Sequence, residues 1–170
     1  MKLYILRHGD AVEHGDPRYN ENARPLTRKG VQRTRQLAHA LRRMRIRFDV
    51  IRSSPLVRAK QTAEIVARGL RQEFSLTDAL KPSANLRELV EDLNALGPVA
   101  GSVLLVGHEP YLGNFVSLIC TGGLDLPLKL KKGGLVRLEV EHLSPAKCAV
   151  LEWLIQPRLF SGRSARSVAE

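Results

Sequence analysis

Short apolar runs alternate with longer amphipathic segments along most of this chain. The runs have the length of buried strands, and the longer segments repeat their apolar residues at the spacing of a helix. Strands are expected at residues 2–7, 48–54, 73–76 and 102–108. Helices are expected at residues 27–45, 55–71, 83–97 and 110–120. Strands that alternate with helices predict a mainly parallel sheet with helices on both faces.

The last part of the chain has a different pattern. Residues 133–141 and 146–155 are two apolar segments joined through Ser144 and Pro145, and they predict an antiparallel strand pair. The expected fold is therefore an α/β protein, a three-layer α/β/α sandwich with a mostly parallel central sheet and an antiparallel C-terminal strand pair. No repeat or linker interrupts it, so residues 1–160 are expected to form one compact domain. The polar residues 161–170 are expected to be a disordered tail.

Composition narrows the class of protein. The chain has 170 residues, of which 44% are hydrophobic and 26% charged, as in an ordinary folded domain. Its apolar runs are too short to span a membrane, and the apolar segment near residue 1 is too short for the hydrophobic region of a secretory signal. Cys120 and Cys148 form no metal or redox motif. We expect a cytoplasmic protein without a cofactor or a membrane partner.

The positive charge is concentrated in the first half of the chain. Residues 1–72 hold 17 Lys and Arg against 6 Asp and Glu, whereas residues 73–170 hold 10 against 11. A positively charged first half attracts anionic partners, which include phosphorylated protein, polyphosphate and nucleic acid. A solvated helix surface explains the segment LRRMRIRF at 41–48 equally well. Only 5% of the residues are aromatic and none alternate with basic residues, so a nucleic-acid partner is not expected.

Three expected strands end in residues that carry chemistry. These ends are Arg7-His8-Gly9, Ser53-Ser54-Pro55 and Gly107-His108-Glu109. In open α/β sheets, ligands bind at the carboxyl ends of the strands, so the three segments are expected to surround one pocket. Ser54 and Pro55 also match an N-cap followed by the first helical residue. Residues 10–26 form a long polar loop, and long loops in compact domains are often functional.

The expected pocket suits a phosphoryl group. Arg58 in the first turn of its helix joins Arg7, and two converging guanidinium groups require an anion between them. The oxygens of a phosphoryl group match the guanidinium fork. The uncharged imidazole of His8 is then a nucleophile for phosphorus, and nearby arginines favour that uncharged form. His108 is placed to donate to the phosphoryl oxygens, and Gly9 lets the backbone approach the ligand.

Each of these features is weak by itself. An Arg-His pair at a strand end is common, and a His after a strand often hydrogen-bonds only a loop. A metal site built from His8, Asp10, His14 and Asp16 matches no defensible ligand spacing, so no metal is expected. The other histidines have no partner pattern and are interpreted as surface or structural residues: His14, His39 and His142.

In combination and in order, the three motifs resemble the histidine phosphatase superfamily, which has the phosphoglycerate-mutase-like fold. LRHGDA resembles its Arg-His-Gly signature, SSPLVRAKQTAEIV its second arginine motif and LLVGHEP its second histidine motif. The Asp after the signature glycine and the segment RPLTRKG at 24–30 resemble the short bacterial phosphohistidine phosphatases of SixA type. The resemblance covers residues 2 to about 120. It implies that His8 becomes phosphorylated, that Arg7, Arg58 and His108 hold the phosphoryl group, and that Arg24 lies at the pocket rim.

A proton donor is harder to assign. An alkoxide leaving a phosphomonoester needs a placed acid. Larger members of the superfamily supply a carboxylate from an inserted segment for which this chain has no room. Asp10 is a candidate donor that could instead only shape its loop. The remaining carboxylates between the two motifs are expected on the outer face of a helix: Glu88, Glu91 and Asp92.

These points favour dephosphorylation of phosphohistidine on a protein, because an imidazole leaves without a dedicated acid. An open pocket with a positive rim from Arg18, Arg24 and Arg28 would meet an acidic partner protein. The alternative is a broad small-molecule phosphomonoesterase, and a more remote one is a non-catalytic protein that binds phosphate or nucleic acid. A mutase is disfavoured because an open pocket exposes the phosphoenzyme to water. A monomer is expected.

Overall fold

The computed structural model describes residues 1–97 and 100–160. Six strands form one mixed sheet in the order β3-β2-β4-β1-β5-β6. The strands are β1 (Lys2–Arg7), β2 (Val50–Ser53), β3 (Ser75–Leu76), β4 (Ser102–Gly107), β5 (Leu135–Val140) and β6 (Ala149–Ile155). The first four are mutually parallel, and β5 runs antiparallel to both β1 and β6. The predicted sheet and its antiparallel C-terminal pair are confirmed.

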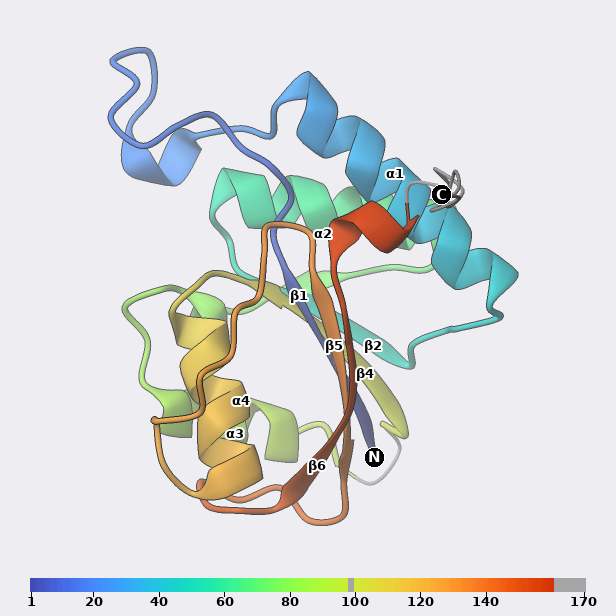
Figure 1. Cartoon of the computed structure of the whole chain (residues 1–170), viewed down its shortest axis with the longest axis vertical. Helices are drawn as coiled ribbons and strands as arrows, with labels where there is room; N and C mark the ends of the chain where they lie inside the picture. Colours follow the sequence, from blue (N-terminus) through green and yellow to red (C-terminus); the bar gives the residue numbers. More distant parts are fainter. Residues whose placement is uncertain (98–99, 161–170) are drawn as a thin grey trace, which may run out of the picture.

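Helices cover both faces of this sheet (Figure 1). They are α1 (Arg28–Arg43), α2 (Val57–Leu70), α3 (Leu86–Asn94) and α4 (Tyr111–Thr121). Alternate residues of β1 point to opposite faces, as the pleat of a strand requires. Tyr4 and Leu6 join the apolar cluster under α1 and α2, and Leu3 and Ile5 join the cluster under α3 and α4. The three-layer prediction is confirmed.

The register of the central strands fixes the positions of the two motif histidines. Arg7 at the end of β1 pairs with Gly107 at the end of β4, so His8 and His108 both follow the same edge of the sheet. The backbone N–H of His8 donates to the carbonyl of Gly107 at 2.9 Å, which continues the pairing one residue further. On the other side of β4, Ser53 pairs with Val106, and Ser54 follows it to that edge.

Helix α1 is fastened to the loop that follows β1. Thr27 is its N-cap, as predicted, and the Thr27 hydroxyl accepts from the Gly30 N–H at 2.9 Å. A Cβ atom on Gly30 would lie 1.9 Å from the backbone oxygen of Asp10, so only glycine allows this close approach. The loop that follows β1 at Asp10 and the first turn of α1 are therefore packed tightly against each other.

Two helix starts differ from the prediction. Helix α2 begins at Val57, and the interpretation of Ser54 as its N-cap is wrong. The Ser54 hydroxyl lies 2.8 Å from the His108 ring, and its distance from the Leu56 N–H is 3.4 Å. Helix α3 begins at Leu86 with Asn85 as its N-cap, so Ser83 does not cap it. Strand β2 is also shorter than the expected 48–54.

Three short 3-10 helices complete the described elements: η1 (Glu21–Ala23), η2 (Asp78–Leu80) and η3 (Pro157–Phe160).

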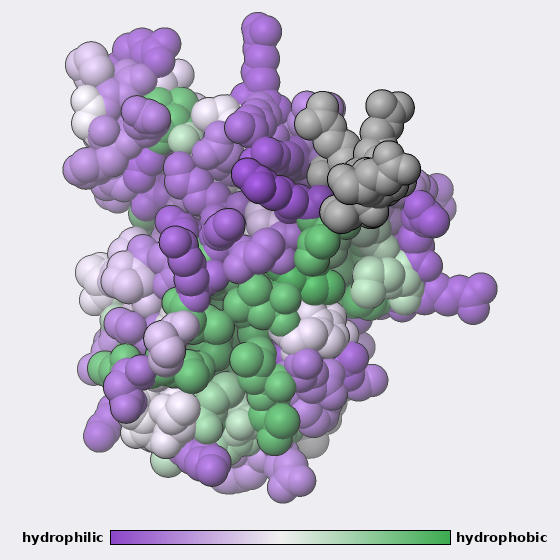
Figure 2. Space-filling view, viewed as in Figure 1, coloured by the Kyte–Doolittle hydropathy of each residue, from purple (hydrophilic) through white to green (hydrophobic). Residues whose placement is uncertain are grey.

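Apolar residues gather on the molecular surface over β5 and β6 (Figure 2). Val150 and Leu151 on β6 are exposed there. Within residues 1–97 and 100–160, no helix has the length and hydropathy needed to cross a bilayer. The expected tail at 161–170 lies outside the described residues.

Candidate active site

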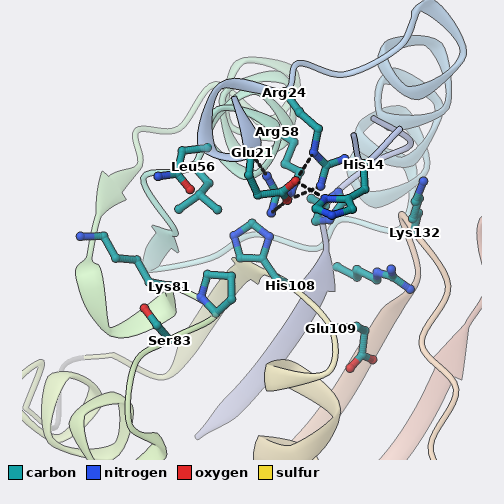
Figure 3. A pocket seen from close by; sticks show the side chains of 14 residues that line it. His14, Glu21, Arg24, Leu56, Arg58, Lys81, Ser83, His108, Glu109 and Lys132 are labelled. Carbon is teal, nitrogen blue, oxygen red and sulfur yellow. Dashed lines mark hydrogen bonds and ion pairs between the residues drawn. The ribbon is translucent and has the colours of Figure 1, made fainter. Parts of the chain in front are cut away.

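A cavity of about 620 Å³ opens at the carboxyl ends of β1, β2 and β4. Its wall contains Arg7, His8, Arg58 and His108, the four residues that the strand ends and the second helix bring together. Loop residues close the rest of it: His14, Glu21, Asn22, Arg24, Leu56, Lys81, Pro82, Ser83, Glu109 and Lys132. Figure 3 shows side chains from both sides of the sheet edge converging on this space.

His8 is held as a neutral ring with one defined free nitrogen. Its Nδ1 lies 2.8 Å from the backbone oxygen of Gly9. A carbonyl oxygen only accepts, so Nδ1 carries the proton and the lone pair is on Nε2. The side chain is 5% exposed. Burial, with the charges of Arg58 and Arg7 adding to it, lowers the pKa of His8 to about 3. The ring is therefore unprotonated at neutral pH and can act as a nucleophile.

His108 faces His8 across the floor of the cavity. The two ring centroids are 5.2 Å apart. The Nε2 of His108 lies 2.8 Å from the Ser54 hydroxyl, and its Nδ1 is buried without a hydrogen-bond partner among the described residues. Burial, followed by the nearness of His8, lowers the pKa of His108 to about 3. This ring is available to hydrogen-bond a bound group without repelling it.

Arg7 and Arg58 supply the positive charge. Arg7 donates to the backbone oxygen of Leu130 at 2.9 Å, and Arg58 donates to that of Glu21 at 2.8 Å. Burial lowers the pKa of each guanidinium, yet arginine stays charged at any ordinary pH. The Nε atoms of both residues are buried and have no partner among the described residues. Unsatisfied buried donors are rare in proteins, and these two belong to side chains that line the cavity.

Glu21 is the centre of an ion-pair cluster above the His108 ring (Figure 3). Its carboxylate pairs with Arg24, lies 3.2 Å from Arg58 and accepts from the Nδ1 of His14 at 2.6 Å. The hydrogen bond from Arg24 is the main reason that the pKa of Glu21 is lowered to about 2, so this carboxylate is ionised at neutral pH. His14 is a surface residue, as predicted, with its side chain 83% exposed, but the sequence did not indicate its pairing with Glu21 at the cavity.

Comparison with known proteins identifies the family. Residues 3–88 match the family model of the histidine phosphatase superfamily (branch 1). The chain belongs to the histidine phosphatase superfamily. Its predicted membership and the phosphatase activity that this membership carries are confirmed.

Two curated proteins are similar to this histidine phosphatase. The phosphohistidine phosphatase SixA of Escherichia coli (strain K12) is 31% identical over 125 residues, which cover 72% of this chain and 76% of the relative. An uncharacterized protein of Picosynechococcus is 38% identical over 141 residues, covering 81% and 84% of the two chains.

Solved structures show the same fold. The protein histidine phosphatase SixA complexed with tungstate superposes with a TM-score of 0.81 and 26% identity, over 94% of this chain and 99% of that one. A phosphohistidine phosphatase SixA from Agrobacterium tumefaciens superposes with a TM-score of 0.74 and 25% identity, over 92% and 97%. The similarity to the SixA type and the phosphoglycerate-mutase-like fold are thereby confirmed.

The rim of this histidine phosphatase is only partly the expected one. Arg24 lines the cavity, but Arg18 and Arg28 do not. Arg18 instead pairs with Asp16 at 2.7 Å on the surface, and Arg28 is exposed on the first turn of α1. The expectation of a rim from all three arginines is wrong, because the loop holds Arg18 against Asp16 and helix α1 presents Arg28 to solvent.

Asp10, the candidate proton donor, does not line the cavity, and neither do the three carboxylates expected on the outer face of a helix. The Asp10 carboxylate accepts from the Thr27 hydroxyl at 3.1 Å and pairs with Lys132 at 3.3 Å, so it fastens its loop to two other segments. Glu88 and Glu91 are exposed on α3, and Asp92 accepts from Thr77 at 3.2 Å. None of these four side chains lines the cavity.

Two lining residues, Glu109 and Lys132, were not assigned a role from the sequence, although Glu109 belongs to one of the three strand ends. Glu109 directly follows His108, and burial raises the pKa of its carboxyl. Its carboxylate accepts from the Gly113 N–H at 3.0 Å and points away from the His108 ring (Figure 3). Lys132 arrives on the loop before β5, where the Gly133 N–H lies 2.9 Å from the backbone oxygen of His8. Among the described residues, no group of three or more His, Cys, Asp or Glu could hold a metal ion.

Proposed function

We propose that this phosphatase hydrolyses phosphohistidine on a partner protein, and that it does so through a phosphorylated His8. The observation that carries the proposal is the floor of the cavity. Two neutral imidazoles lie there beside the buried Arg58 and the half-buried Arg7. Among the described residues, no carboxyl group that could donate a proton faces them. Similarity to the SixA of Escherichia coli, a phosphohistidine phosphatase, supports the same substrate class.

The first step transfers the phosphoryl group to His8. The Nε2 lone pair of His8 forms a bond to phosphorus, and the phosphorus–nitrogen bond of the substrate breaks. The bonding pair returns to the substrate imidazole, which leaves as a neutral ring when its far nitrogen already carries a proton. Arg7 and Arg58 match the charge on the phosphoryl oxygens, and His108 is placed to donate to them.

The second step releases phosphate. Water attacks the phosphorus of the phosphorylated ring, and the Nε2–phosphorus bond breaks with its electron pair returning to His8. The water loses a proton to the phosphate oxygens or to solvent, so the cycle ends with inorganic phosphate and the neutral ring. The Nδ1 atom of His8 keeps its proton throughout, because it donates a hydrogen bond to the Gly9 carbonyl. The proposal uses no metal ion in either step.

The carboxylates of the cavity explain the preference for a nitrogen leaving group. An alkoxide needs a proton from an acid that is protonated and near the leaving oxygen. Glu21 has a pKa of about 2 and so has no proton to give at neutral pH. Glu109 has a raised pKa but points away from His108 (Figure 3). An imidazole leaving group avoids this requirement.

A competing function is hydrolysis of small phosphomonoesters, and Glu109 is the observation that favours it. If this side chain turned toward the cavity, its raised pKa would let it donate a proton to an alkoxide. The wild-type protein, His8→Ala and Glu109→Gln should therefore be assayed with a phosphohistidine peptide, a sugar phosphate and an aryl phosphate at matched concentrations.

We expect a preference of about a hundredfold or more for the phosphohistidine peptide, no turnover by His8→Ala and little effect of Glu109→Gln. Equal or faster hydrolysis of the sugar phosphate would contradict the proposed substrate. If Glu109→Gln then removed only the sugar-phosphate activity, Glu109 would be the acid. Turnover by His8→Ala would instead contradict the proposed intermediate.

A further inference from the structure

A second hollow lies at the end of the molecule opposite the active site. It has a volume of about 460 Å³ and is lined by Arg42, Arg45, Ile46, Arg47, Leu70 and Arg71. These residues stand where α1 and α2 end and just before β2 begins, whereas the active site follows the carboxyl ends of the strands. The two cavities share no lining residue. We call this second cavity the arginine hollow.

The charges of the arginine hollow are uncompensated. In residues 1–97 and 100–160, none of its four guanidinium groups has a hydrogen bond or an ion pair. Residues 22–48 contain nine Lys and Arg and no Asp or Glu. Four like charges on one concave surface repel one another, and their repulsion falls when an anion lies between them.

The backbone at two of these arginines is unusual. Arg45 has a φ of 56° and Arg71 a φ of 57°, and within the described residues they are the only non-glycine residues with a positive φ. Each follows the end of a helix, where glycine is the usual residue because it adopts this left-handed conformation without strain. At both helix ends the chain has arginine instead, and both arginines line the same hollow.

Complementing the helix dipoles does not account for this much charge. A helix C-terminus is equivalent to about −0.5 of an elementary charge, so the ends of α1 and α2 together offer about −1. Four arginines exceed that by about three charges. The excess matches an anion that carries several negative charges close together.

We propose that the arginine hollow binds a ligand with two or more consecutive phosphoryl groups, either a nucleoside di- or triphosphate or an inorganic oligophosphate. Guanidinium groups bind phosphoryl oxygens through paired hydrogen bonds, and all four cations here are arginine rather than lysine. Ile46 and Leu70 add an apolar part to the wall, which suits the base or sugar of a nucleotide.

A neighbouring hollow extends the same surface. It has a volume of about 290 Å³, lies between α1 and α2, and shares Arg42 with the arginine hollow. Arg35 and His39 also line it, together with Arg68, whose charge is paired with Glu64 at 2.6 Å. Hydrophilic side chains project from the molecule where α1 ends (Figure 2). A chain of more than three phosphoryl groups could continue into this space.

Isothermal titration calorimetry with sodium tripolyphosphate, ATP, AMP and inorganic phosphate tests the proposal. The variants are Arg42→Ala and the pair Arg45→Gly with Arg71→Gly, since glycine keeps the left-handed backbone while removing the side chain. The matched control is Arg43→Ala, an equally charged and exposed neighbour on α1 that does not line the hollow. Arg58→Ala reports any binding at the active site, and thermal unfolding checks that each variant is folded.

We expect tripolyphosphate or ATP to bind more tightly than AMP or phosphate. Arg42→Ala and the paired glycine variant should each weaken that binding by about tenfold or more, and Arg43→Ala by less than about twofold. Their turnover of an aryl phosphate should equal that of the wild type. ATP binding more tightly than tripolyphosphate would assign the nucleotide, and equal affinities would assign the phosphate chain alone.

Four results would overturn the proposal: no heat of binding for tripolyphosphate and ATP, equal weakening by Arg43→Ala, loss of the binding only in Arg58→Ala, or binding of a duplex DNA oligonucleotide with none of tripolyphosphate. The first result would mean that the arginines only complement the dipoles of the two helix ends. The second would indicate a diffuse charge effect, the third binding in the active site, and the last a nucleic-acid surface.

Discussion

The imidazole rings of His8 and His108 lie with their centroids 5.2 Å apart, although they come from opposite halves of the chain. The parallel pairing of β1 with β4 produces this relationship, because Arg7 is in register with Gly107. Both rings are neutral. Among the residues that the structure describes, the His8 ring presents a free Nε2 and the His108 ring has an unpartnered Nδ1. This pair is the structural basis of the predictions below.

Replacement of His8 by alanine should abolish turnover, because no other side chain offers phosphorus a free imidazole nitrogen in this position. Wild-type protein mixed rapidly with substrate and quenched in alkali should contain a phosphorylated histidine, and the variant should not. Unchanged circular dichroism would establish that the variant is folded. Alkali-stable phosphorylation that persists in His8→Ala would assign the nucleophile to another residue.

Ser54→Ala should lower kcat by about tenfold with little change in KM, since the Ser54 hydroxyl orients the His108 ring at 2.8 Å. The matched control is Ser53→Ala. Ser53 is equally buried, but within the described residues its hydroxyl donates to the backbone oxygen of Ser54 and does not contact His108. Steady-state kinetics of both variants decides the matter, and equal effects on kcat would mean that Ser54 has a packing role only.

The two active-site histidines should stay neutral where ordinary histidines titrate. Their pKa values are lowered to about 3, so protons bind to them only as the pH falls well below the usual histidine range near 6.5. Nitrogen-15 NMR of the histidine rings between pH 5 and 8 should show two rings without a titration step. In that spectrum the His8 ring should carry its proton on Nδ1. Titration of the His8 signal near pH 6.5 would contradict the buried, neutral ring.

Glu21→Gln should tighten the binding of inorganic phosphate by about two- to fivefold. The wild-type carboxylate competes with the ligand for Arg58, and it is nearly half exposed, so solvent screens part of its charge. The hydrogen bond that Arg58 donates to the backbone oxygen of Glu21 is kept in the variant, which preserves the position of the guanidinium. Glu64→Gln, which removes a solvent-exposed ion pair with Arg68 on α2 and does not line the active-site cavity, is the control. Product-inhibition constants measure the change, and weaker binding would mean that Glu21 positions Arg58 instead.

Removal of metal ions should leave the rate unchanged. The two arginines and His108 supply the positive charge and hydrogen bonds that a metal ion would otherwise contribute at the phosphoryl group. Assays before and after dialysis against EDTA test this, with a metal-dependent phosphatase treated in parallel. Loss of activity that added zinc or magnesium restores would contradict a reaction carried by the side chains alone.

The sequence predicted the sheet and its histidines because both depend on local pattern. An apolar run of strand length identifies β1 and β4 without reference to the rest of the chain, and His8 and His108 simply follow these runs. The cluster around Glu21 could not be found this way. Its partners His14, Arg24 and Arg58 come from two segments, and their meeting depends on how a polar loop without periodicity folds over the sheet edge.

Ser54 shows why a good local signal can still mislead. Serine before proline is a favourable helix start, and nothing near it in the sequence indicates another use for the hydroxyl. The competing partner, His108, is brought in only by β4. For Arg18, in contrast, the competing partner is close in the sequence. Asp16 lies two residues before it and holds it on the surface, away from the cavity.

The pairing of β1 with β4 also bears on how this protein could evolve. His8 and His108 are attached to the most buried strands of the sheet and cannot shift relative to each other without breaking its register. Residues 12–23 and 81–85, by contrast, meet the cavity from exposed or half-buried segments, so their side chains can change at little cost to the core. Substitutions in these segments could therefore give the protein new substrates, while the relative positions of His8 and His108 stay unchanged during evolution.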